Sequence, residues 1–161
     1  MDGFKIAIAT KDGDQEDLIL IGAEESTEER TMIDSVEIFF DTTDDNVRSK
    51  SSSMLAKIEI KGKISDEIAM MKKLRKLSEW AHDRSSDTAY RDVCIGMKAK
   101  EDIYQVVYTL KNVFVVDYKE NYTLSEAGSC FELRLTQREN NMDNIEILSD
   151  WPSDPKFGQK S

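Results

Sequence analysis

The stretch "SSSMLAKIEIKGKISDEIAMMKKLRKLSEWA", residues 51–81, changes its hydrophobic period once, at Ser65. Before Ser65, apolar and charged residues alternate, as they do in a strand with one buried face. After it, apolar residues recur every three or four positions, as they do on an amphipathic helix. The stretch therefore predicts a half-buried strand that leads directly into one helix of about residues 65–82.

The predicted helix has signals at its start and two distinct faces. Ser65 is a candidate N-cap, and the acidic Asp66 and Glu67 suit the positive end of the helix dipole. The other face is basic and is either a solvated surface or a site for an acidic partner. We expect the apolar face to carry Ile68, Met71, Leu74, Leu77 and Ala81, and the basic face to carry Lys72, Lys73, Arg75 and Lys76.

Short strands are predicted on both sides of this stretch. One helix among so many strands leaves too little helix for crossovers between parallel strands. The fold class is therefore mainly β, a small antiparallel β-barrel or sandwich with one flanking α-helix. Besides the strand before Ser65, the alternating or apolar runs lie at residues 4–10, 18–22, 36–40, 90–99, 103–110, 113–118 and 130–137.

The length of 161 residues suits one domain with its own core. We assign that domain to residues 1–150 and expect the proline-broken residues 151–161 to form a flexible C-terminal tail. No apolar run is long enough to cross a bilayer, and the N-terminus lacks the features of a signal peptide. We therefore expect no membrane span and synthesis in the cytoplasm.

The net charge of −10 is distributed unevenly along the chain. Residues 1–45 carry 14 acidic and 3 basic residues, residues 46–100 carry 7 and 13, and residues 101–161 carry 11 and 6. Such an acidic protein lacks the concentrated basic face that general nucleic-acid binding needs. Opposite charges in separate segments suit contacts between copies of the chain, although solvation or pairing within one monomer produces the same pattern.

The sequence contains no recognisable catalytic or metal-binding motif. His82 is its only histidine, and the two cysteines, Cys94 and Cys130, lie in predicted strands, where we expect them to be reduced. The acidic clusters at residues 12–17 and 41–45 do not match the spacing of a calcium-binding loop. We expect no enzyme activity, no cofactor and no metal site. A hydrolase would need His82, a carboxylate and either a serine or Cys94 in one cleft.

One polar segment, "DTTDDNVRSKSSS" at residues 41–53, is much longer than a hairpin requires. A flexible loop of this length costs conformational entropy when its ends are brought together. Loops this long in a compact domain usually have a function of their own. We therefore expect a partner or a ligand to order this segment.

The order of elements resembles the tail-tube fold. Two segments carry the resemblance: residues 51–81, quoted above, and "NVFVVDYKENYTLSEAGSCFELRLTQRE" at residues 112–139. The likeness in element order extends over residues 4–148. This superfamily joins the tube proteins of contractile phage tails and tail-like particles with the haemolysin-coregulated protein, Hcp, of type VI secretion.

The resemblance implies a structural subunit of hexameric rings that stack into a tube, within a phage-tail-like particle or a secretion apparatus. Its partners would be copies of itself, with sheath, baseplate or spike proteins as further candidates. In such proteins a long arm between early strands reaches a neighbouring subunit. The acidic connector at residues 23–35 is one candidate for that arm, and a monomeric β-barrel that binds a ligand or a protein is the alternative function. The arm that we expect consists of Arg48, Ser49, Lys50, Ser51, Ser52, Ser53 and Met54.

Overall fold

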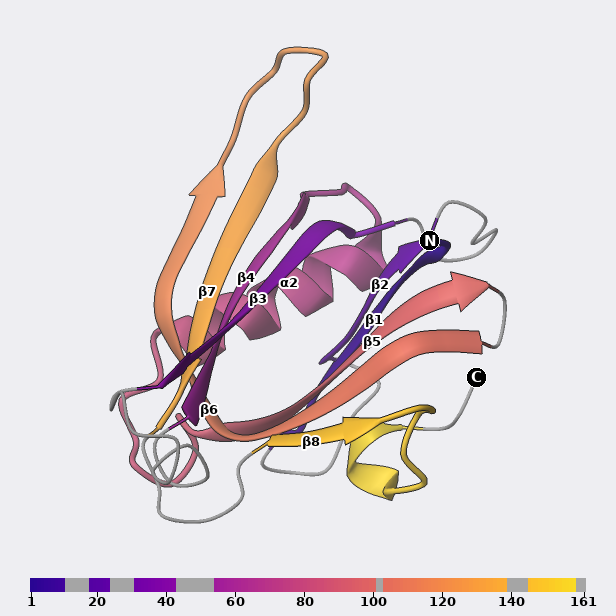
Figure 1. The fold of residues 1–161 in the computed structure, drawn as a ribbon. Coiled ribbons are helices and arrows are strands. Elements are labelled where there is room, and N and C mark those ends of the chain that lie inside the picture. Colours follow the sequence, from indigo (N-terminus) through magenta and orange to yellow (C-terminus); the bar gives the residue numbers. More distant parts are fainter. Residues whose placement is uncertain (11–17, 24–30, 43–53, 101–102, 139–144, 159–161) are drawn as a thin grey trace.

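The computed structural model describes residues 1–10, 18–23, 31–42, 54–100, 103–138 and 145–158 (Figure 1). These residues form an eight-stranded antiparallel sheet, one α-helix and a short 3₁₀ helix. This architecture confirms the predicted fold class. The elements are β1 (Gly3–Ile8), β2 (Ile19–Ala23), β3 (Ile33–Thr42), β4 (Met54–Lys63), α2 (Ile68–Ala81), β5 (Arg91–Lys100), β6 (Ile103–Asn121), β7 (Cys130–Gln137), β8 (Ile145–Leu148) and η3 (Pro155–Phe157).

The sheet is open in its strand order but curls toward closure. Its order is β2-β1-β5-β6-β7-β4-β3, and β8 pairs with β6 beside this path. The 19-residue strand β6 belongs to both halves of the sheet, since it pairs first with β5 and β8 and then with β7 (Figure 1). The two ends of the order meet where the Met32 backbone N–H donates a hydrogen bond of 2.9 Å to the Ile21 carbonyl.

The core lies between the two halves of the sheet and is built by alternation. In the register of β4 and β7, Ile58 faces Leu135 and Ile60 faces Leu133. All four side chains are at most 2% exposed, and burying each contributes about 1.5–3 kcal/mol. The intervening Lys57 points away and is exposed. The alternation predicted for this strand is thus confirmed.

Helix α2 packs on this core with a face that is rotated from the predicted one. Leu77 is fully buried and Leu74 is 9% exposed, whereas Ile68 is 70% exposed. The expectation that Ile68 belongs to the buried face was therefore wrong. Periodicity identifies a stripe, but it does not show on which side of that stripe the contact with the sheet lies. The buried residues of the helix are Met70, Lys73, Leu74, Leu77 and Trp80.

The ends of α2 differ in how well the sequence predicted them. Ser65 does not cap the helix, because the N-cap is Glu67 and its backbone N–H donates to Ser65 Oγ at 3.1 Å. The helix ends at Ala81 with His82 as its C-cap, close to the expected end at residue 82. The His82 backbone N–H donates to the carbonyls of Ser78 and Glu79, and its Nδ1 lies 2.8 Å from the Ser78 carbonyl oxygen.

The segment after β8 packs against the outer face of β1 and β5. Trp151 and Phe157 are each 3% exposed, and the Trp151 indole N–H donates to the Phe157 carbonyl at 3.2 Å. The Lys5 ammonium lies 4.3 Å from the centre of the Trp151 ring. This packing of residues 151–158 differs from the flexible tail that we expected. The burial of two aromatic side chains orders the segment even though its prolines prevent a regular strand or helix. The second small core contains Ala7, Cys94, Tyr104, Val107, Trp151 and Phe157.

Candidate assembly surface

The two halves of the sheet differ in whether other residues cover their outer faces. The half formed by β1, β5 and the start of β6 is covered by residues 151–157, beside which Leu148 at the end of β8 packs. The other half, formed by β3, β4, β7 and the end of β6, presents its outer side chains to solvent. We call this second surface the open face. Its outward side chains include Ser35, Glu37, Phe39, Asp41, Lys57, Glu59, Lys61, Lys63, Val116, Asp117, Lys119, Glu132, Arg134 and Thr136.

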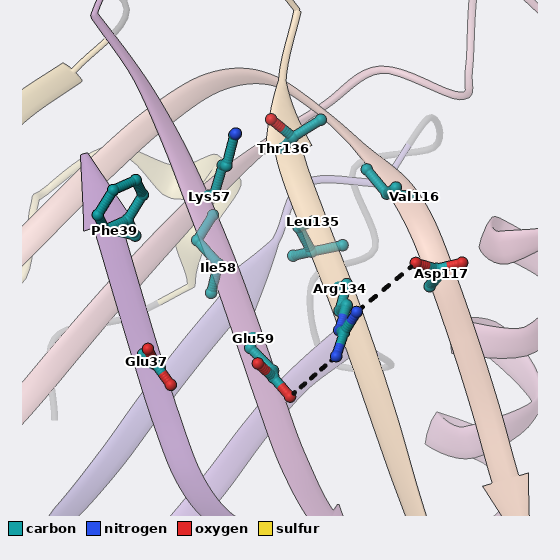
Figure 2. A pocket seen from close by; sticks show the side chains of 10 residues that line it. All are labelled: Glu37, Phe39, Lys57, Ile58, Glu59, Val116, Asp117, Arg134, Leu135 and Thr136. Carbon is teal, nitrogen blue, oxygen red and sulfur yellow. Dashed lines mark ion pairs between the residues drawn. The ribbon is translucent and has the colours of Figure 1, made fainter. Parts of the chain in front are cut away.

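One row of charged side chains crosses the open face. Glu37, Glu59, Arg134 and Asp117 are register partners on four adjacent strands (Figure 2). The Arg134 guanidinium lies 3.8 Å from Glu59 Oε1 and 4.0 Å from Asp117 Oδ2. Glu37 stands opposite Glu59, an arrangement of like charges that is unfavourable in a sheet. Exposed ion pairs contribute at most about 1 kcal/mol each, so this row does little to hold the fold.

Several other charges of the open face also pair with their neighbours. Lys61 Nζ lies 3.6 Å from Glu59 Oε1 and 3.9 Å from Glu132 Oε1. Lys57 Nζ lies 3.4 Å from Asp41 Oδ2. The result is a mosaic of both signs with little net charge. Such a surface creates no strong field that would attract nucleic acid or a strongly charged ligand.

Two large apolar side chains interrupt this charged surface. Phe39 of β3 is 57% exposed and Val116 of β6 is 53% exposed. They flank a shallow depression of about 400 Å³ (Figure 2). Val116 is the extra residue of a β-bulge, since the register passes from Val115–Leu135 directly to Asp117–Arg134. Single exposed apolar residues are common on protein surfaces, so Phe39 and Val116 indicate a contact surface only together with the depression between them and the neighbouring edge strand.

Sequence reasoning did not identify this surface. Its signal was present in residues 36–40, "VEIFF", where Phe39 occupies the polar phase of the alternation. The position of Val116 had no signal, because a bulge shifts the phase of the side chains after it. Arg134 and Asp117 are also ordinary surface residues when they are considered one at a time.

Strand β3 forms one end of the strand order. Its only ladder partner among the described residues is β4. The start of this ten-residue strand lies against β2, where the Met32 N–H donates to the Ile21 carbonyl. Beyond that start, an edge strand presents backbone N–H and C=O groups that another strand can pair with. This edge borders the open face, so an added strand would extend that face.

The predicted arm lies next to this edge in the chain. Residues 48–53 lie outside the described residues, and Met54 is the first residue of β4, where it pairs with Thr42 of β3. The segment between these two residues therefore leaves from the edge strand. In the acidic connector, the other candidate arm, residues 24–30 also lie outside the described part of the chain.

Cys94, the candidate cysteine nucleophile, lies in an unreactive setting. Cys94 is fully buried in β5, and burial raises the pKa of its thiol to about 12, so the thiol stays protonated at neutral pH. Cys130 lies in β7, and both cysteines are free thiols in strands, as predicted. His82 is exposed at the end of α2. The hydrolase hypothesis therefore loses its cysteine nucleophile.

The other sequence-level expectations concern metals and membranes. In the part of the chain that the structure describes, no cluster of three or more metal-binding side chains occurs. Most of the two acidic clusters falls outside that part, and Asp41 pairs with Lys57. Among the described helices, none combines the length and the apolar character needed to span a bilayer.

Comparison with known proteins finds likeness in structure but not in sequence. No family model matches the chain, and no curated protein matches it. Hcp1 from Salmonella typhimurium is 10% identical with a TM-score of 0.51, over 90% of this chain and 85% of that one. Hcp1 from an E. coli pathovar is 10% identical with a TM-score of 0.52, over 94% of this chain and 100% of that one.

A structure of the anti-feeding prophage baseplate, described as 6-fold symmetrised, contains a third similar chain. That chain is 9% identical with a TM-score of 0.50, over 92% of this chain and 94% of that one. At such low identity these likenesses show the fold alone. They confirm the resemblance to the Hcp-like tail-tube fold that the order of elements indicated.

Proposed function

We propose that this chain, whose fold is that of the Hcp-like tail-tube proteins, is a non-catalytic structural subunit that forms hexameric rings of its own copies. These rings stack into the tube of a phage tail, a tail-like particle or a contractile injection or secretion system. The observation that carries the proposal is the edge strand β3 beside the open face. Soluble monomers usually blunt or cover such an edge.

Ring formation would use both the edge strand β3 and the open face. A neighbour that pairs with β3 continues the sheet, so the open faces of successive copies join into one wall. Phe39 lies on β3 itself and becomes buried when the neighbouring strand is added. Sheath, baseplate or spike proteins are the further partners that follow from this role.

The alternative, a monomeric module that binds a ligand, receives less support. Small-molecule sites are usually concave and enclose most of the ligand. The depression between Phe39 and Val116 is shallow and lies on a sheet surface with ion-paired charges around it. A surface of this kind suits a broad contact or a wall better than the capture of a small molecule.

We expect replacement of residues 48–53 by a Gly/Ser linker of equal length to abolish rings while the fold is retained. On this proposal the contacts of the arm are made with a neighbouring copy, so the melting temperature of the variant should change little. Size-exclusion chromatography with light scattering and negative-stain microscopy measure the assembly, and circular dichroism measures the melting.

The matched control is a Gly/Ser replacement of residues 139–144, a second connection of similar length. This control should assemble like the wild type. If the variant at residues 48–53 forms normal rings, the arm assignment is wrong. If it unfolds, the segment belongs to the monomer's own sheet. A wild-type chain that stays monomeric at every concentration contradicts the whole proposal.

We expect assembly to weaken as the salt concentration rises from about 0.05 to about 0.5 M. Residues 1–45 and residues 46–100 carry opposite net charges, and contact between copies brings them together. Over this range the Debye length falls from about 14 to about 4 Å, which screens the attraction. Sedimentation velocity at fixed protein concentration measures the assembled fraction. Association that is unchanged or strengthened by salt would assign the contact to apolar burial instead.

A further inference from the structure

The hairpin between β6 and β7 projects well beyond the rest of the molecule (Figure 1). We call residues 122–129 the hairpin tip. Leu124 in this tip is fully exposed, and Tyr122 is 64% exposed. The Tyr122 hydroxyl donates a hydrogen bond of 2.5 Å to Glu120, which holds that ring at the base of the tip. An apolar side chain is thus presented at the end of a long projection.

The tip is held in one conformation by its own hydrogen bonds. The Thr123 backbone N–H donates to Ser129 Oγ at 3.0 Å, and the Ser129 hydroxyl donates back to the Thr123 carbonyl at 3.4 Å. The Gly128 N–H donates to the Ser125 carbonyl at 3.1 Å. Gly128 has φ of +80°, a conformation that glycine adopts without strain. A preorganised tip loses little conformational entropy when it binds.

A concave aromatic site is lined by residues from the end of α2, the loop after it and β6. In Figure 1 the end of α2 lies far from the projecting end of the hairpin. We call this site the aromatic notch. Its volume is about 280 Å³, many times the roughly 30 Å³ that one water molecule occupies in the liquid. The rings of Tyr90 and Phe114 meet edge to face on one side of it, with centroids 5.5 Å apart. Its lining includes Trp80, Arg84, Ser86, Tyr90, Phe114 and Val115.

The rim of the notch is also preformed. The Asp83 carboxylate accepts hydrogen bonds from the Ser85 backbone N–H at 2.9 Å and from the Thr88 hydroxyl at 2.7 Å. The Trp80 indole N–H donates to the Ala89 carbonyl at 2.8 Å. These bonds fix the loop after α2 from both ends, so the notch needs no rearrangement to accept a side chain.

The two ends of the molecule carry complementary charge. Glu126 in the hairpin tip and Arg84 on the rim of the notch are exposed, and neither forms an ion pair with any described residue. Arg138 adds a second positive group, stacked 4.9 Å from the centre of the Tyr90 ring. The Asp83 carboxylate on the same rim lies 3.9 Å from the Arg91 guanidinium and accepts hydrogen bonds within the loop. A tip with an apolar end and an exposed glutamate thus matches an aromatic notch that carries the exposed Arg84.

We propose that Leu124 of one copy inserts into the aromatic notch of a second copy, with Glu126 facing Arg84. The inference rests on the proposed function and identifies a contact between stacked rings. The hairpin tip and the notch lie at different ends of the folded molecule. When two copies make this contact, one copy still has a free notch and the other still has a free tip. A head-to-tail contact of this kind propagates into an open assembly rather than closing as a dimer.

Disulfide trapping tests this contact directly. The double variant Leu124→Cys/Ser86→Cys, made with Cys130→Ser, should form a ladder of covalent oligomers under mild oxidation on a non-reducing gel. An equal mixture of the two single variants should stop at dimers. The control pair Leu124→Cys/Lys100→Cys places the second thiol away from the notch and should give no ladder.

Each outcome decides the inference. A missing ladder in the double variant overturns it, and so does efficient dimerisation of Leu124→Cys alone, which would indicate a contact between two tips. If electron microscopy shows wild-type rings but no ladder forms, the proposed function stands and the inference falls. If a ladder forms without rings, the contact is real and the ring proposal fails.

A charge in the tip provides a second measurement. Leu124→Asp should reduce the fraction of stacked rings about tenfold or more, because the carboxylate would lose its hydration in an aromatic site. Single rings should persist, since Leu124 lies away from β3. The matched control is Ile103→Asp, which alters another apolar side chain that is 57% exposed. Equal stacking of Leu124→Asp and the wild type overturns the inference.

Discussion

Trp80→Ala should lower the free energy of unfolding by about 3–5 kcal/mol, the range for truncating a large buried aromatic residue. Trp80 is 1% exposed and lies in the last turn of α2, where it belongs to the main core. Truncation leaves a cavity and removes the indole partner of the Ala89 carbonyl. The Arg91 guanidinium, 5.2 Å from the ring centre, also loses its aromatic contact.

Urea denaturation followed by circular dichroism measures this loss. Trp80→Phe should cost less, because it keeps most of the apolar burial and loses the hydrogen bond. Ile68→Ala on the same helix should change stability by no more than about 0.5 kcal/mol, since Ile68 is 70% exposed. Equal effects of Trp80→Ala and Ile68→Ala would show that the buried face of α2 is assigned incorrectly.

Gly62→Ala should destabilise the protein by at least about 3 kcal/mol, at the upper end of the usual effect of overpacking. A Cβ atom at this position would lie 2.1 Å from the Met32 carbonyl oxygen and 2.5 Å from the Phe131 ring. The same carbonyl accepts a hydrogen bond of 2.8 Å from the Lys63 backbone N–H. Backbone on one side and a ring that is 1% exposed on the other leave little room for relaxation.

Gly128→Ala is the matched control. Its Cβ would meet no atom within 4 Å, and only its φ of +80° opposes the substitution. That conformation costs about 1–2 kcal/mol for a residue with a side chain. A Gly62→Ala protein as stable as Gly128→Ala would mean that the junction of β3 and β4 is much more adaptable than its packing indicates. Thermal denaturation of both variants makes the comparison.

Local periodicity explains what could be predicted about the fold. The strand ending near residue 64 and the helix after it were visible because each alternates buried and exposed positions with its own period. The predominance of strands over helix then indicated an antiparallel sheet. The pairing of these strands could be predicted only in outline, since periodicity does not specify which strands pair.

The sequence by itself determined most of the elements, their order and most of their inward faces, and this order was sufficient to indicate the tail-tube fold. It missed β8 (Ile145–Leu148) and predicted two strands, 103–110 and 113–118, where β6 is one continuous strand. Only the tertiary structure decided which outer face of the sheet is covered and which stays open. Trp151 and Phe157 cover β1 and β5 through contacts with residues far away in the chain, while the bulge at Val116 turns a valine outward on the open face. An alternating pattern distinguishes the two sides of a strand, but the cover over its outer side depends on long-range packing that no local period encodes.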